Sequence, residues 1–256
     1  MHHHLADRCT RQTCDLNKAC ILAASSLYDG DWLLAAPITS VDLSMSDEMI
    51  LVAMGYRLRL RTCEPHTCPC DKDMDARGLN GLSCRRSSAR QQRHAQLNDI
   101  IWRAIKRAQI PIANEPVGLS RTAGKRPNGA TLISWSREKP LVWNVTVPDT
   151  FAESHLKDIA VLAGAVAKSG GNIQDYQLHV NNNTHLFVPI AIDTSGAWNN
   201  ETIEIVQEIG KRIKSITNDL NKTNYLFQRI STAIKRGNAV SFLNIYSHEQ
   251  ERQLDH

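Results

Sequence analysis

The stretch Leu141-Val142-Trp143-Asn144-Val145-Thr146-Val147-Pro148 is the part of the sequence that decides the fold. Nearly all of its residues favour β-structure, and Pro148 supplies a stop because proline has no N–H to donate to a sheet. We therefore predict a strand over Leu141–Val147.

Shorter strand signals lie on both sides of this stretch. One covers Ala113–Leu119, a second covers Gly129–Trp135 after the turn Lys125-Arg126-Pro127-Asn128, and a third covers Leu186–Ile192. Apolar residues at helical spacing predict four helices around them. These helices cover His94–Ala108, Ala152–Ala167, Glu201–Thr217 and Asn224–Arg236, and the apolar run Val240–Ile245 is expected to close the fold. From residue 94 the order is helix, three strands, helix, strand, which predicts an α/β (α+β) core with a mixed sheet flanked by helices.

The chain is expected to divide into four parts. They are a helical N-terminal segment (1–62), a cysteine-rich knuckle (63–93), the mixed core with its C-terminal helices (94–246) and a disordered tail (247–256). In the N-terminal segment, helical patterns run over Leu16–Leu27 and Asp47–Leu60. A chain of 256 residues is long enough to bury a sizeable core.

Composition excludes several classes of protein. Hydrophobic residues make up 42% and charged residues 22%, as in an ordinary globular protein. No apolar run reaches the roughly 18 residues of a membrane span, so no membrane partner is expected. The start of the chain lacks the basic and then apolar layout of a secretory signal. We therefore expect an intracellular, nuclear protein.

Basic residues gather in clusters although the formal net charge is only +4. Clusters of this kind follow a phosphate backbone in proteins that bind DNA or RNA. The alternative is a set of solvated helix faces. The predicted nucleic-acid contacts are Arg85, Arg86, Arg90, Arg93, Lys125 and Arg126.

The seven cysteines indicate a metal site rather than a disulfide framework, because their number is odd and no secretory signal precedes them. Cys68, Cys70 and Cys84 supply three thiolates within a short stretch. Structural zinc needs four nitrogen or sulfur ligands in a tetrahedron. His66 is the predicted fourth ligand, and Cys63 or His94 are alternatives to it. The other interpretation is a reduced, metal-free loop.

Two segments resemble motifs of a known family. They are Lys125-Arg126-Pro127-Asn128-Gly129 and Val142-Trp143-Asn144-Val145-Thr146. Knuckle sequences such as Pro65-His66-Thr67-Cys68-Pro69-Cys70 and Gly81-Leu82-Ser83-Cys84 add to the resemblance. In this order they resemble the cysteine knuckle and restriction-enzyme-like, PD-(D/E)XK-type endonuclease region that follows the reverse transcriptase of animal non-LTR retrotransposons. The family has Arg-Pro-Asp before its second strand and Asp-Val-Thr in its third. The resemblance spans most of residues 30–240.

The resemblance implies a restriction-endonuclease-like core that cleaves phosphodiester bonds with Mg²⁺ or Mn²⁺. Its two metal-binding carboxylates fall at Asn128 and Asn144, so both are replaced by amides, and Glu115 is the acid that remains. A Lys-Tyr pair of the family falls at Asp175-Tyr176, which leaves Lys168 as the nearest lysine. The family's knuckle histidine falls at Asn80. The metal chemistry is therefore expected to be eroded.

Three functions remain open. The first is an inactivated retrotransposon-derived nuclease domain that keeps a nucleic-acid-binding surface, with an ancestral reverse transcriptase module as its partner. The second is an active endonuclease that uses Glu115, Lys168 and one of Asp149 or Asp193. The third is a host-adopted binding or scaffold protein that has no enzymatic activity.

Overall fold

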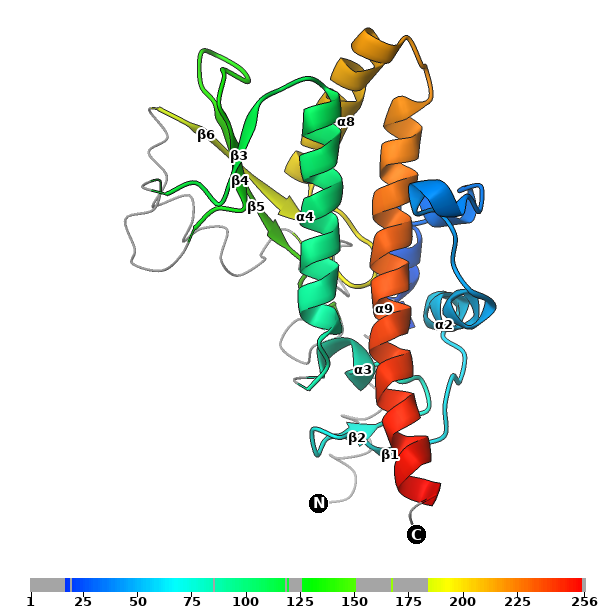
Figure 1. Cartoon of the computed structure of the whole chain (residues 1–256). Coiled ribbons are helices and arrows are strands. Elements are labelled where there is room, and N and C mark those ends of the chain that lie inside the picture. Colours follow the sequence, from blue (N-terminus) through cyan, green and yellow to red (C-terminus); the bar gives the residue numbers. More distant parts are fainter. Residues whose placement is uncertain are drawn as a thin grey trace.

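The structure is a computed structural model, and it describes residues 17–18, 20–84, 86–117, 119, 126–150, 167 and 184–254. These residues form a mixed α+β protein with a four-stranded sheet, a small two-stranded sheet and long helices (Figure 1). The expected combination of helices and strands is confirmed.

The four-stranded sheet consists of β3 (Ile112–Asn114), β4 (Gly129–Thr131), β5 (Leu141–Thr146) and β6 (Leu186–Ala191), in that order. The first two pairs are antiparallel and the β5–β6 pair is parallel. The predicted mixed sheet is therefore present. A parallel pair needs a crossover connection, and the helix predicted there lies, apart from residue 167, outside the described residues.

Two strands are shorter than their apolar runs predict. β3 ends at Asn114, because Glu115 adopts a positive φ of 45° that a strand cannot accommodate. β4 ends at Thr131, and Leu132 and Ile133 beyond it are exposed. Apolar sequence alone therefore overestimated the length of both strands.

The core lies where β5 meets the helices. Leu141, Trp143 and Val145 of this strand are at most 2% exposed. They pack in one cluster with the apolar faces of α4 (Ala89–Arg107) and α8 (Asn200–Thr217). Nε1 of Trp143 donates a hydrogen bond of 3.1 Å to Oδ1 of Asn98, which ties the strand to α4. The decisive stretch of sequence is thus the centre of the fold.

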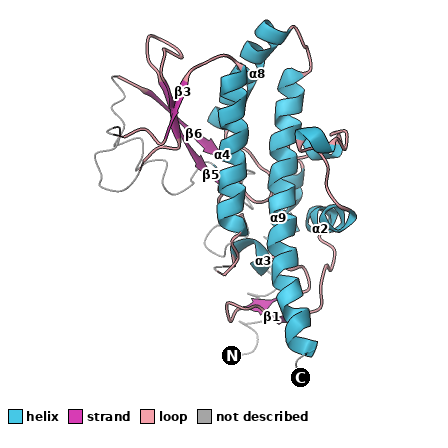
Figure 2. Ribbon diagram, in the orientation of Figure 1, coloured by secondary structure: helices cyan, strands magenta, loops and turns pink. Residues whose placement is uncertain are grey.

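A single long helix, α9 (Lys222–Leu254), runs beside α4 (Figure 2). It also contacts α8, α2 (Asp47–Leu58) and α3 (Asn80–Ser83). The prediction that helix 224–236 is followed by a separate apolar element over Val240–Ile245 was wrong. Ala239, Phe242 and Ile245 recur at helical spacing and bury one face against the knuckle. The helix also continues into the predicted disordered tail.

The N-terminal segment packs on α9. It contains η1 (Asp31–Leu33), η2 (Thr39–Val41) and α2 (Asp47–Leu58), close to the predicted second helix. Oγ of Ser46 accepts a hydrogen bond of 3.4 Å from Met49 N–H, and this interaction caps α2. Within the described ranges, none of the helices combines the length and apolar character that crossing a bilayer requires.

The knuckle consists of the hairpin β1 (His66–Thr67) and β2 (Asp73–Met74) followed by the short helix α3 (Asn80–Ser83). Its cysteines and Met74 form a cluster with Val52 of α2 and the C-terminal half of α9. The knuckle is therefore packed against both helices.

Candidate functional site

Three knuckle thiols converge. The Sγ atoms of Cys68, Cys70 and Cys84 all lie within 4.8 Å of one another, and all three residues are buried. Cys68 Sγ is 3.4 Å from Cys84 Sγ and 3.4 Å from Cys70 Sγ. In the part of the chain that the structure describes, this is the only close group of three or more His, Cys, Asp or Glu side chains. A buried set of three sulfurs can hold a soft or borderline metal ion such as zinc.

Local structure explains this convergence. Cys68 and Cys70 lie in the turn of the β1–β2 hairpin, where Cys68 N–H donates to Lys72 O and Asp71 N–H donates to Cys68 O. Asp71 has a positive φ of 67°, which closes the turn. Cys84 follows α3 directly, so the short helix delivers the third sulfur.

The predicted fourth ligands do not join the group. His66 is outside it, and its Nδ1 lies 2.8 Å from the Glu64 carbonyl oxygen. Cys63 Sγ donates instead to the Asp75 carbonyl at 3.4 Å, and His94 is absent from the cluster. The side chain that approaches the sulfurs is Asn80, whose Nδ2 lies 3.7 Å from Cys70 Sγ. Asn80, where the resemblance placed the knuckle histidine of the family, is thus next to the three thiols.

Burial and hydrogen bonds give the Cys68 and Cys70 thiols different pKa values. Burial raises the pKa of the Cys68 thiol to about 12. Burial acts in the same direction on Cys70, but hydrogen bonds from Cys68 and Asn80 outweigh it and lower the Cys70 pKa to about 7. The cluster therefore already stabilises one thiolate near neutral pH, which is the ligand form that a metal requires.

The sheet aligns the three positions implied by the nuclease resemblance. Asn114 pairs with Gly129 and Gly129 pairs with Trp143, and Glu115, Asn128 and Asn144 are the sequence neighbours of these three residues. Just beyond the paired residues, Glu115 N–H donates to Asn128 O at 3.2 Å, which continues the β3–β4 register. Asn128 N–H donates to Trp143 O at 3.0 Å, which is one residue out of the β4–β5 register. Three predicted site residues thus lie in a short row at neighbouring positions where β3, β4 and β5 adjoin.

The side chain of Asn128 already has a structural role. Its Oδ1 accepts a hydrogen bond of 2.7 Å from the Val145 N–H. Glu115 is exposed and Asn144 is half-buried. The row therefore offers one carboxylate, with two amides where acids would bind Mg²⁺. The fourth predicted catalytic residue, Lys168, lies outside the described residues.

Asp149 and Asp193 come together at the ends of the parallel strands, but they serve the turns there. Asp193 is buried, and its Oδ1 accepts from the Gly196 and Ala197 N–H groups at 3.1 and 3.0 Å. Thr194 Oγ1 donates to Asp149 Oδ1 at 3.2 Å. Burial raises the pKa of Asp193. Asp193 is thus engaged in its own turn, and Asp149 is bound by Thr194 across the two strand ends.

The predicted basic surface is partly confirmed as exposed. Arg86, Arg90 and Arg126 face solvent, whereas Arg85 and Lys125 lie outside the described residues. Arg93 is a correction: it is 2% exposed, and its guanidinium donates to Leu82 O at 2.7 Å. It occupies the buried face of α4, where burial lowers its pKa. Arg93 therefore joins the knuckle to α4 and does not belong to the surface.

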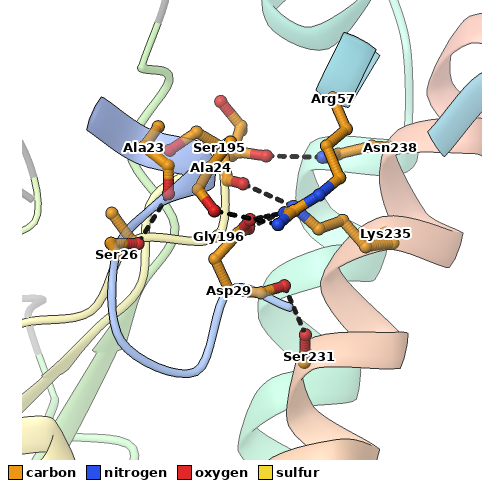
Figure 3. A network of polar contacts seen from close by, with 12 residues as sticks. Ala23, Ala24, Ser26, Asp29, Arg57, Ser195, Gly196, Ser231, Lys235 and Asn238 are labelled. Atoms are coloured by element: carbon orange, nitrogen blue, oxygen red, sulfur yellow. Dashed lines mark hydrogen bonds and ion pairs between the residues drawn. The ribbon is translucent and has the colours of Figure 1, made fainter. Parts of the chain in front are cut away.

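Sequence reasoning missed a buried ionic cluster (Figure 3). Asp29, 1% exposed, forms ion pairs with Arg57 of α2 and Lys235 of α9. Lys235 also donates to the Ser195 carbonyl, and Gly196 approaches closely. A cavity of about 30 Å³ beside this cluster has room for a water molecule. No periodicity could reveal the cluster, because its members are more than 20 residues apart and each is an ordinary surface type.

No model of a known protein family matches this chain, and no curated protein matches it significantly.

Proposed function

We propose that this chain is a nuclease-like domain that binds nucleic acid without cutting it, with a zinc-binding knuckle. The observation that carries the proposal is the row of Glu115, Asn128 and Asn144, which lie at neighbouring positions where β3, β4 and β5 adjoin. These are the positions that the resemblance assigned to metal ligands. Their proximity supports a common architecture, and the two amides support loss of the chemistry.

The charge of the row argues against Mg²⁺-dependent cleavage. Hydrolysis of a phosphodiester needs a cation that holds the phosphate and activates water. Mg²⁺ prefers anionic oxygen ligands, and the row supplies only the carboxylate of Glu115. Oδ1 of Asn128 already accepts a hydrogen bond from the Val145 N–H. Binding of Mg²⁺ here should therefore be weak.

Nucleic-acid binding is supported by the exposed cations beside the knuckle. Arg90 lies in the first turn of α4, and Arg86 precedes it with a side chain that is 65% exposed. The ion pair from Arg86 to Asp71 spans 4.0 Å between exposed groups, so it contributes little and leaves the cation available for phosphate. Each phosphate that such cations neutralise releases counterions, which favours binding at low salt.

The cysteine cluster supports a structural metal in the knuckle. Zinc held by Cys68, Cys70 and Cys84 would clamp the hairpin to the end of α3, next to the start of α4 where Arg90 lies. Because the same cluster packs against α9, metal binding would be coupled to folding of this end of the molecule.

Cleavage is tested with supercoiled plasmid in Mg²⁺ or Mn²⁺, comparing the natural chain with the Asn128→Asp/Asn144→Asp variant. We expect no cleavage by the natural chain, and cutting by the variant would show that the row is a lost metal site. Equal cutting by the natural chain would overturn the proposal.

Binding is tested separately with a labelled DNA duplex at several salt concentrations. The affinity of the natural chain should fall as salt rises, and Arg90→Glu should reduce both the affinity and the steepness of the salt dependence. Lys211→Glu, the same charge change on the exposed face of α8, is the matched control. Absence of duplex binding at low salt would favour a scaffold role instead.

A further inference from the structure

A groove of about 500 Å³ lies away from the knuckle and from the strand row. It opens between the C-terminal half of α4, the end of α8, the start of α9 and the segment 38–43 around η2. Leu43, Ala104, Ile213 and Leu226 contribute buried apolar surface to its lining. Its volume is within the roughly 300–1,000 Å³ that small-molecule sites occupy.

Cationic side chains line this apolar groove. Arg103, Arg107, Lys222 and Arg229 contribute to it, and Asp42 is the one acid in the lining. Lys222 forms an ion pair with Asp219 at 2.6 Å and Arg229 forms one with Asp42 at 3.3 Å, so the cations open to a ligand are the two arginines of α4. Arg107 makes no ion pair with any residue that the structure describes. The ion pair of Arg103 with Asp99 is exposed on both sides, so water screens it and a ligand anion can replace it. The groove therefore favours a ligand with negative charge.

An aromatic ring stands in the same wall. Tyr225 is 44% exposed, and Lys222 Nζ lies 5.6 Å from the centre of its ring. The exposed ring and the apolar lining suit the flat face of a ligand, and the guanidinium groups suit an anion attached to it. A nucleotide has both parts, because every base has a face that can stack and every linkage carries one negative charge.

We propose that this groove binds one nucleotide unit of a single-stranded nucleic acid. The base stacks on Tyr225 over the apolar floor, and the adjoining phosphate pairs with Arg107 and Arg103. A base within a duplex is covered on both faces, so the groove selects single strands. This inference extends the proposed nucleic-acid binding to a second surface, distinct from Arg86 and Arg90 at the other end of α4.

The test measures anisotropy of a fluorescein-labelled single-stranded octathymidylate against the natural chain and single-residue variants. Tyr225→Ala should weaken binding about 5- to 150-fold through loss of one stacking contact, whereas Tyr225→Phe should keep the affinity within about twofold. Arg107→Glu should weaken binding and lower the salt dependence. Lys211→Glu makes the same charge change outside the groove lining and should have a clearly smaller effect.

Two further probes separate the possible outcomes. If Tyr225→Ala binds the octamer as tightly as the natural chain, the groove inference is wrong, even where duplex binding persists and the proposed function stands. If the natural chain binds the octamer through Tyr225 but does not bind duplex, the groove inference holds and the proposed duplex contacts at Arg86 and Arg90 are excluded. If octaglutamate displaces the octamer at equal concentration, the groove is a site for acidic peptides and the inference is overturned.

Discussion

Oδ1 of Asn128 accepts a 2.7 Å hydrogen bond from the backbone N–H of Val145, so a side chain completes the pairing between the start of β4 and the buried strand β5. Val145 is 2% exposed, and water cannot readily replace a lost partner at its N–H. The position implied as a former metal ligand therefore also has a structural role.

Replacing Asn128 by alanine should lower the free energy of unfolding by about 1–2 kcal/mol, because the Val145 N–H is left without an acceptor. Asn128→Asp keeps an acceptor oxygen and should cost less. Urea denaturation of the two variants measures the difference. Equal stability of Asn128→Ala and the natural chain would show that the hydrogen bond contributes nothing.

Gly129 is required by the neighbouring indole. A Cβ atom at this position would lie 2.1 Å from Cζ2 of Trp143, which is fully buried. Gly129→Ala should therefore destabilise the protein by about 1–3 kcal/mol, as overpacked cores do. Gly30→Ala is the control, because its Cβ would meet Arg57 at an ordinary 3.6 Å. Comparable melting temperatures for both variants would contradict the argument.

The buried ionic cluster predicts an order of effects. Lys235→Met leaves Asp29 paired with Arg57 and should cost about 1–3 kcal/mol. Asp29→Asn leaves two cations without their shared anion and should cost more, about 3–5 kcal/mol. The double variant should lose less than the sum of the single changes. Chemical denaturation measures all three, and the reverse order would show that Asp29 is not the centre of the cluster.

Placing a nitrogen ligand at position 80 should strengthen zinc binding. Asn80→His places an imidazole beside Cys70, which would complete a Cys₃His set, whereas Cys84→Ser removes a thiolate. Zinc affinity, measured by competition with a chromogenic chelator, should rise in the first variant and fall in the second. Addition of EDTA should lower the melting temperature of the zinc-loaded natural chain. An unchanged affinity in Cys84→Ser would exclude the cluster as the site.

The acidity of Cys70 makes the metal-free protein sensitive to pH. Its pKa of about 7 is below the ordinary value of 9.0, so its contribution to stability is present at high pH and is lost as the pH falls through about 7. Thiolate absorbance should accordingly rise between about pH 6 and about pH 8 and be missing in Cys70→Ser. Asn80→Ala removes a donor and should move this midpoint upward. A midpoint near 9 in the natural chain would contradict this assignment.

The sequence by itself determined the elements whose burial follows a regular pattern along the chain. The run 141–147 predicted β5 because almost every side chain is apolar or β-branched, and the α4 stripe from Leu97 to Ile105 predicted a helix with one buried face. The cysteine spacing likewise indicated the thiol cluster, because Cys68 and Cys70 are close in sequence and need only one turn to converge with Cys84.

Only the tertiary structure decided features that depend on partners distant in sequence. Arg93 reads as one more surface cation, yet packing of α4 against α3 and α9 buries it. In the sequence, Val240–Ile245 is a separate apolar run. In the structure it is part of α9, and one face of it packs against the knuckle and α2. The Asp29 cluster and the nucleotide-sized groove arise where α9 meets segments some 200 residues earlier. Local sequence encodes periodicity, whereas burial and pairing of charges are properties of the assembled surface, so no local pattern could have shown them.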